Sequence, residues 1–298
     1  MIGIANGAFQ KALGENTKIE VKVFNAGPSV IEAMFAQALD LAYIGPNPAI
    51  NGYVKSDGQA LNIVAGATSG GAALVVLEDS GISKAGDFHH RKIASPQLGN
   101  TQDVSLRYWL KNNGLLLKEN GGDVSVVPVA NPDQLTLFKK KEIAGAWTVE
   151  PWVSRLIHEG GGRLFLEESS LWPGKKFVTA NIIVRKKFLK EHPDLVKKWI
   201  LAHVDLTAWI NDNPEEAKNI LNQEIKKLTG QALPKEILND AFSRLEITYD
   251  PIKESLFTSA KMAYEQGFLG KNMPDLSGIY DLTILNEVLR DKKLTEIN

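Results

Sequence analysis

The sequence of 298 residues contains no cysteine, which excludes disulfide bonds, thiolate metal sites and cysteine nucleophiles. It has no apolar run near the ~20 residues that a membrane-spanning helix needs. Its first residues, MIGIANGAFQKALG, are typical of an amphipathic helix rather than of a secretory signal. With 34 basic and 35 acidic side chains, it also lacks the net field that favours nucleic acid or an acidic membrane. What remains is a chain long enough for one large or two medium globular domains.

Over the first ~180 residues, strand-like and helix-like segments alternate, a pattern that predicts an α/β fold with a largely parallel sheet. Residues 19–24 (IEVKVF) and 39–45 (LDLAYIG) read as strands, each followed by an apolar helical segment. The second of these helices is expected to begin with Pro48 at its first position and Asn47 as its cap.

Residues 23–48 and 126–151 match in type without a gap when one is shifted by about 103 positions. Each reads as a strand, a proline-containing cap, an apolar helix, a small-residue strand and an x-Pro helix start. Identities are few, so coincidence stays open, but the pattern favours two similar α/β lobes.

The comparison also exposes a difference at the front of the two repeats. The second repeat is preceded by a strand (KIAS), a loop (PQLGN) and a helix, whereas the chain begins within the helix that would precede the first. We therefore expect the first strand and loop of lobe one to be missing, as in an N-terminally truncated chain. A missing strand leaves an exposed sheet edge or a gap.

After Asn181 the alternation of strands and helices ends. One strand leads into successive helices whose N-terminal residues are typical of helix starts. We expect lobe one to comprise residues 1–76 and 179–298, including C-terminal helices packed on it, and lobe two residues 77–178. A separate helical domain is the alternative. Two extended crossings between two lobes predict a hinge with a cleft, where small-molecule sites are common.

Residues 94–114 place a loop of small and amide residues before a helix. Asn100 or Thr101 can cap that helix, and Gly99 permits the turn. The free N–H groups of a helix start suit an anion, and Gln97, Asn100 and Thr101 add neutral hydrogen bonds. An ordinary helix cap is the alternative, but the expected cleft favours an anion site.

Further candidates follow from the repeat and from the hinge. Asn47 caps a helix in lobe one, and Glu150 occupies the matching place in lobe two. Ser69 and Gly70 supply a hydroxyl and an unshielded backbone at the hinge. Trp147 is expected to line the cleft wall and to grip an apolar part of the ligand.

No pattern in the chain predicts catalysis. The five histidines are scattered in contexts that look like surface loops or helices. No His-Glu-x-x-His, nucleophile elbow, phosphate loop or dinucleotide fingerprint occurs, and no carboxylate cluster has metal-ligand spacing. We expect a protein that binds rather than reacts, without a metal or cofactor.

Several segments carry a resemblance to a known family. It rests on EAMFAQALDLAYIGPNPAINGYV, VAGATSGGAALVV, IASPQLGNTQDVSLRYWLKNNG, PDQLTLFKKKEIAGAWTVEPWVSRL and LWPGKKFVTANIIV. Together with the C-terminal helices they resemble the substrate-binding proteins of bacterial ABC importers. The most similar group is the aliphatic sulfonate, taurine and nitrate type, with the two-lobed type II periplasmic-binding-protein fold. The resemblance covers effectively the whole chain.

The resemblance implies a small anionic ligand, such as an alkanesulfonate or a taurine-like compound, and a membrane permease as partner. It implies a periplasmic or extracellular membrane-associated location, with no nucleic acid bound. The ligand contacts that it implies are Asn47, Ser69, Gly70, Gln97, Asn100, Thr101, Trp147 and Glu150. The chain departs from the family at its front, because members begin with a strand and a ligand-facing loop before the first helix, and we expect both to be missing here.

Two other classes share this fold. A pyrimidine-synthesising enzyme would carry a cysteine-rich motif, and this chain has no cysteine. A sensory effector-binding module would usually be fused to a DNA-binding or kinase domain, and neither is recognisable here.

Overall fold

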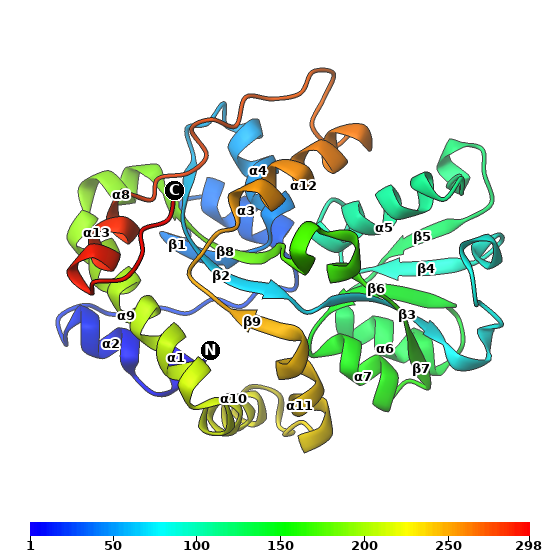
Figure 1. The fold of residues 1–298 in the computed structure, drawn as a ribbon, viewed down its shortest axis with the longest axis horizontal. Helices are drawn as coiled ribbons and strands as arrows, with labels where there is room; N and C mark the ends of the chain where they lie inside the picture. Colours follow the sequence, from blue (N-terminus) through cyan, green and yellow to red (C-terminus); the bar gives the residue numbers. More distant parts are fainter.

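Strand β2 (Leu61–Gly70) runs almost directly into β3 (Ala72–Leu77), yet the two strands belong to different sheets. Both are apolar and nearly fully buried, so each is the central element of its own core. The computed structural model describes residues 1–298 and shows a lobe around each sheet (Figure 1). The predicted two-lobed α/β fold is confirmed. The prediction of a largely parallel sheet is wrong, because the lobe-one sheet is antiparallel throughout and only two pairs of lobe two are parallel.

Lobe one is built on a four-stranded sheet in the order β1-β8-β2-β9, in which every pair is antiparallel. Helices α4 and α12 cover one face, and α9 and α13 cover the other. The other strands of the sheet are β1 (Leu41–Ile44), β8 (Val178–Arg185) and β9 (Leu245–Ile247). The helices on this side of the hinge are α1 (Ile2–Ala5), α2 (Ala8–Leu13), α3 (Gly27–Phe35), α4 (Pro46–Lys55), α8 (Lys186–Glu191), α9 (Pro193–Asp212), α10 (Pro214–Thr229), α12 (Lys253–Glu265) and α13 (Thr283–Asp291).

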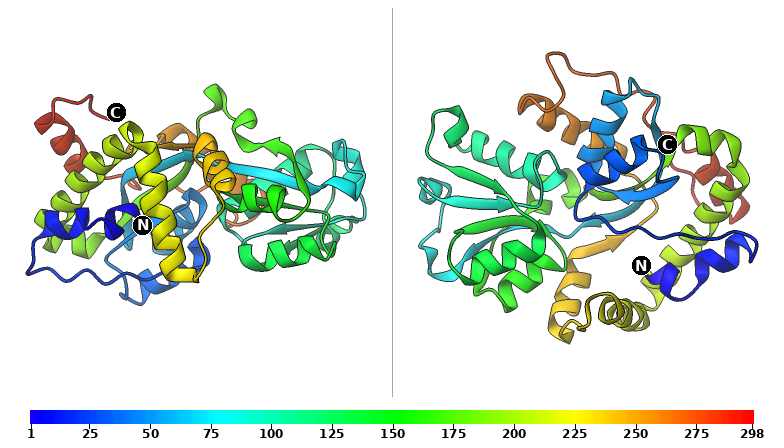
Figure 2. Two further views of the ribbon diagram at one scale, coloured as in Figure 1. Left: turned by 90° about the horizontal axis from the view of Figure 1, so that it is seen from below. Right: turned by 180° about the vertical axis from the view of Figure 1, so that it is seen from behind.

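Lobe two is built on a five-stranded sheet in the order β5-β4-β6-β3-β7. Strand β4 pairs in parallel with β5 and β6, while β3 runs antiparallel to β6 and β7. Helix α5 packs on one face, and α6 and α7 pack on the other (Figures 1 and 2). The bounds are β4 (Lys92–Ser95), α5 (Thr101–Asn112), β5 (Ser125–Pro128), α6 (Asn131–Lys139), β6 (Gly145–Val149), α7 (Trp152–His158) and β7 (Gly162–Glu167).

The prediction of a strand at residues 19–24 is wrong. These residues form no regular structure, and Val23 is 80% exposed. Strand β1 pairs only with β8, so its other edge carries no strand. Beside that edge lies a largely apolar cavity of about 580 Å³, bounded by residues 19–24, the N-terminal helices and α9. The segment has strand-like composition, but a strand forms only where a neighbouring strand accepts its hydrogen bonds.

The C-terminal helices pack on lobe one as predicted, with one exception. Helix α11 (Lys235–Arg244) lies against α7 of lobe two, and Figure 1 shows it beside the hinge strands. Between α10 and β9 the chain therefore reaches lobe two and returns to lobe one near Arg244, and α11 departs from the boundaries expected from the sequence.

The expectation that the histidines are at the surface is wrong for His203 on α9, which is 4% exposed. Its Nε2–H donates to the carbonyl oxygen of Gly66 (2.9 Å), and its Nδ1 lies 3.3 Å from the Tyr43 hydroxyl. Burial lowers the pKa of His203 from 6.5 to about 4. His203 is thus a neutral core residue of lobe one. No helix of the structure combines the length and the apolar character of a membrane span.

Candidate functional site at the junction of the lobes

Helix α5 begins at the loop that the sequence singled out. Asn100 is its N-cap, in an extended backbone conformation, and its Oδ1 accepts a hydrogen bond from the N–H of Asp103 (2.8 Å). Gly99 adopts a φ of +74°, which glycine tolerates best. The predicted cap at Asn100 is confirmed. This capping bond satisfies the N–H of Asp103 alone. The other N–H groups of the first turn have no partner within the helix.

A buried carboxylate holds this loop in shape. Asp103 accepts hydrogen bonds from Ser95 Oγ (2.6 Å), from the N–H of Gly99 (3.0 Å) and from Arg107 Nε (2.9 Å). Arg107 is nearly buried as well and also pairs with Glu119. The negative charge of Asp103 is therefore used within lobe two, and it fixes the position of Asn100 and Thr101.

Helix α4 of lobe one begins two residues earlier than the sequence suggested. Gly45 is its N-cap and Pro46 its first helical residue, so the expected cap at Asn47 is wrong. The Asn47 side chain is 3% exposed, and its Nδ2 donates to the carbonyl oxygen of Ser259 on α12 (3.2 Å). Proline suits the first helical position because its missing N–H has no partner there anyway, and Pro46 rather than Pro48 fills this role.

The starts of α4 and α5 meet across the junction. A Cβ atom placed on Gly45 would lie 2.6 Å from Thr101 Oγ1 and 3.6 Å from the carbonyl oxygen of Thr179 on β8. Beside this contact, Gln97 Nε2 of lobe two lies 3.5 Å from Ser29 Oγ on α3 of lobe one. The two lobes thus touch through the two helix starts, and the absence of a side chain at Gly45 permits the approach.

Several buried polar atoms at this junction have no partner in the protein. They include Gln97 Oε1, Thr101 Oγ1 and both polar atoms of the Asn181 side chain. Thr101 is 4% exposed and Asn181 is fully buried. Buried polar groups without partners are few in native proteins, and each needs a reason such as a ligand or ordered water.

The hinge adjoins the junction. Ser69 and Gly70 end strand β2, where they pair with Val178 of β8 and with β9. A Cβ on Gly70 would lie 2.6 Å from the Arg244 carbonyl oxygen, and its φ is +74°, so glycine is required there. The Thr179 hydroxyl donates to the Gly70 carbonyl oxygen. Thr179 therefore connects the hinge to the contact between the helix starts.

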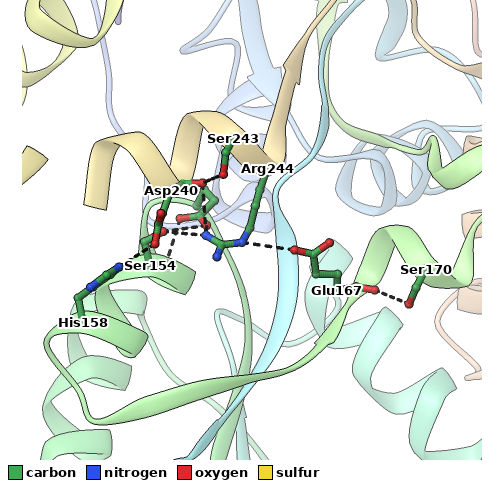
Figure 3. Close-up of polar contacts among 8 residues, drawn as sticks. Ser154, His158, Glu167, Ser170, Asp240, Ser243 and Arg244 are labelled. Carbon is green, nitrogen blue, oxygen red and sulfur yellow. Dashed lines mark hydrogen bonds and ion pairs between the residues drawn. The ribbon is translucent and has the colours of Figure 1, made fainter. Parts of the chain in front are cut away.

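Glu150 lies at the same hinge, but the protein itself occupies its carboxylate. Its N–H donates to the Gly71 carbonyl oxygen, and its fully buried side chain accepts hydrogen bonds from Ser154 and from Arg244 Nη1 (2.9 Å). Burial raises the pKa of Glu150, and the bonds from Ser154 and Arg244 oppose this effect. Figure 3 shows the Arg244 guanidinium, from the end of α11, between Ser154 and Glu167 of lobe two.

The expected place of Trp147 on the cleft wall is wrong. The side chain is fully buried in the core of lobe two that β3 and α5 share, and its Nε1–H donates to Glu168 Oε2 (2.7 Å). Trp147 lies on a strand that is buried on both faces, so the alternation of its side chains does not show which of them face the core. The structure thus separates Trp147 from the other predicted site residues.

Sequence reasoning did not single out Thr179 or Asn181. Both belong to β8, whose run FVTANIIV was treated only as a crossing strand. The available signal was the asparagine itself, since Asn is depleted within strands and mostly exposed in proteins. Together, the junction offers neutral amide and hydroxyl groups beside the start of α5. Such a set can hold a small oxyanion by hydrogen bonds and the helix dipole.

Comparisons with known proteins agree with this architecture. The chain is 28% identical over 222 residues to a putative binding protein of Brucella abortus, covering 74% of this chain and 66% of that protein. It thus spans just under two thirds of the length of that relative. It is 24% identical over 276 residues to the taurine-binding periplasmic protein of Escherichia coli, covering 88% of this chain and 82% of that one.

Among solved structures, the alkanesulfonate-binding protein SsuA from Xanthomonas axonopodis pv. citri, bound to MOPS, superposes with a TM-score of 0.75. The sequence identity is 17%, and the match covers 91% of this chain and 90% of that one. At that identity the likeness shows the fold alone. A family model described as the NMT1-like family matches residues 1–223, about three quarters of the sequence. The chain therefore belongs to the NMT1-like family.

Proposed function

We propose that this chain is the solute-binding component of an ABC import system that captures a small sulfonate between its lobes. The observation that carries the proposal is the group of buried, unpartnered polar atoms on Gln97 and Thr101 at the start of α5 and on Asn181 of strand β8. The ligand class is supported by a relative named as a taurine-binding protein and by the similar structure of an alkanesulfonate-binding protein.

The site holds the ligand by hydrogen bonds without reacting with it. Its free groups are amides, a hydroxyl and backbone N–H groups, whereas the nearby carboxylates of Asp103 and Glu150 are already bonded to Arg107 and Arg244. An oxyanion at the helix start therefore meets donors and no free carboxylate. This arrangement favours an anion over a cation.

The ligand is captured when the two lobes close around it. In the structure, Thr101 of lobe two lies against Gly45 of lobe one, so the ligand enters only after the lobes separate at the hinge. Bonds from both lobes then lower the free energy of the closed form. By the proposed function, a membrane permease recognises the closed, loaded shape, and the protein works in the periplasm or at the outer face of a membrane.

The test is a thermal-shift screen with taurine, ethanesulfonate, butanesulfonate, sulfate and nitrate. A ligand at 100 times its dissociation constant adds about 2.7 kcal/mol to the free energy of unfolding. We expect a sulfonate to raise the melting temperature and the inorganic ions to leave it unchanged. If no sulfonate raises it while nitrate or sulfate does, the ligand class is wrong. If no anion of the panel acts, the proposed function fails.

A further inference from the structure

Asn181 is a buried amide that nothing in the protein satisfies. It lies in the middle of β8 with an exposed fraction of 0%, and neither Oδ1 nor Nδ2 has a hydrogen-bond partner. Asn62, a buried asparagine of the same sheet, is different, because its Nδ2 donates to the carbonyl oxygens of Gly278 (2.8 Å) and Ile279 (3.3 Å). An unsatisfied buried polar group destabilises a fold, because it has lost its hydrogen bonds to water without replacing them. Asn181 therefore needs an explanation that Asn62 does not need.

The direction of the Asn181 side chain follows from the sheet register. Asn181 lies directly opposite Ile44 in the antiparallel pair of β8 and β1. Residues directly opposite each other place their side chains on the same face of a sheet. Ile44 belongs to the core cluster that also contains Val104, in the first turns of α5. Asn181 thus lies on the face of this cluster, opposite the residue that precedes Gly45, and Gly45 meets Thr101, whose hydroxyl is also unpartnered.

The chemistry of an amide says what would satisfy it. Whichever way the amide is turned, Asn181 presents an N–H donor and a carbonyl acceptor. The oxygens of a sulfonate accept hydrogen bonds and donate none, so a simple alkanesulfonate satisfies only the donor. The carbonyl oxygen needs an N–H or O–H group.

We infer that Asn181 is a specificity-determining contact of the junction and selects sulfonates that carry an amino or hydroxyl group near the oxyanion. This inference rests on the proposed function and names the ligand class more narrowly. The sulfonate lies at the start of α5, and the donor group of the ligand reaches the Asn181 carbonyl oxygen on β8.

The first arm of the test compares three sulfonates of equal length by titration calorimetry. Taurine and 2-hydroxyethanesulfonate carry the donor, and 1-propanesulfonate has a methyl group in its place. We expect the wild type to bind the first two roughly tenfold tighter than 1-propanesulfonate, because only they form a hydrogen bond to the buried Asn181 carbonyl oxygen. Asn181→Val should remove that preference. An unchanged preference in the variant overturns the inference.

The second arm measures thermal unfolding without ligand, with Asn62→Val as the matched control. Asn181→Val should melt at or above the wild-type temperature, since it removes an unsatisfied amide, whereas Asn62→Val should melt lower. A loss at Asn181 equal to that at Asn62 shows a structural amide and overturns the inference. Asn181→Ala provides the same affinity comparison if the valine variant does not fold.

The two proposals fail in different ways. If the wild type binds all three sulfonates equally, the inference about Asn181 is wrong while the proposed function stands. If the wild type binds none of them, the proposed function fails and the inference fails with it.

Discussion

The sheets of the two lobes have a similar order of strands and helices, but they differ in the strand that lies at one position. In lobe two, β4 lies between β5 and β6, and the sheet has five strands. In lobe one, β1 follows α3 as β6 follows α6, but the place beside β1 that corresponds to β4 holds no strand. Residues 19–24, which match β5 in the repeat, lie unpaired beside an apolar cavity. Apolar composition alone therefore does not make a strand; a partner edge is also needed.

The difference extends to how each core is held together. Lobe two buries Trp147 in an aromatic cluster and bonds it to a fully buried glutamate, Glu168. Lobe one buries a neutral histidine, His203, next to the open cavity. The following changes test this contrast in order of expected size.

The largest effect is expected in the core of lobe two. Trp147→Ala should lower the free energy of unfolding by about 3–5 kcal/mol, because it opens a cavity and removes a bond to Glu168. Urea unfolding followed by circular dichroism measures it. A loss below about 1 kcal/mol would show that the core of lobe two is not as well packed as the structure indicates.

The pH dependence should have opposite signs in the two lobes. The pKa of His203 falls from 6.5 to about 4 in the folded protein. The stability it contributes is complete above pH 6.5 and is lost as the pH falls toward 4, by about 3 kcal/mol in all. Burial raises the pKa of Glu168, opposed by bonds from Trp147 and Ser105. Its contribution is therefore complete at low pH and is lost as the pH rises above the ordinary value of 4.5.

Urea titrations from pH 4 to pH 8 on the wild type, His203→Gln and Glu168→Gln separate the two effects. His203→Gln should lose much of the acid-side decline in stability. Glu168→Gln should make that decline steeper, because it removes the opposing contribution. Identical profiles for all three proteins would show that neither group is coupled to folding.

An intermediate effect is expected at the ion pair that joins α11 to lobe two. Arg244→Ala leaves the Glu150 carboxylate buried without its cation and should lower the free energy of unfolding by about 1.5–3 kcal/mol. Adding Glu150→Gln should restore part of the loss, since the second change removes the uncompensated charge. Strictly additive losses in thermal or urea unfolding would argue against the pairing.

The smallest effect is expected in the unpaired segment of lobe one. Val23→Ala, at a side chain that is 80% exposed, should change the free energy of unfolding by no more than about 0.5 kcal/mol. Val126→Ala, at the matching position of the repeat in β5, is the control and should cost more, because Val126 is buried and paired with β4. Equal losses at both positions would mean that residues 19–24 are packed as a strand in solution.

Local signals in the sequence predicted the structure correctly where one residue determines the backbone conformation. Asn100 before a helical pattern predicted the cap of α5, and the two extended crossings between the lobes predicted the hinge. The two lobes followed from the alternation of elements and the internal repeat. These features depend on capping, on φ and on periodicity, all of which are readable in one chain.

Features that depend on contacts between residues far apart in the chain could not be predicted from the sequence. The burial of Trp147 depends on α5 packing over its strand and on β3 pairing beside it. The carboxylate of Glu150 meets Arg244 from a helix that begins 85 positions later in the chain. Asn47 turned out to bond α12 rather than to cap α4. Asn181 entered the candidate site only once the register of β8 against β1 was known.

The central claim is that an oxyanion binds where the starts of α4 and α5 meet. The most direct test is a calorimetric titration of taurine into the wild type, Thr101→Val and the control Thr136→Val, whose hydroxyl lies on the exposed side of α6. The account predicts that Thr101→Val weakens binding about tenfold or more while Thr136→Val does not change it. Equal affinity in all three proteins would contradict the placement of the site.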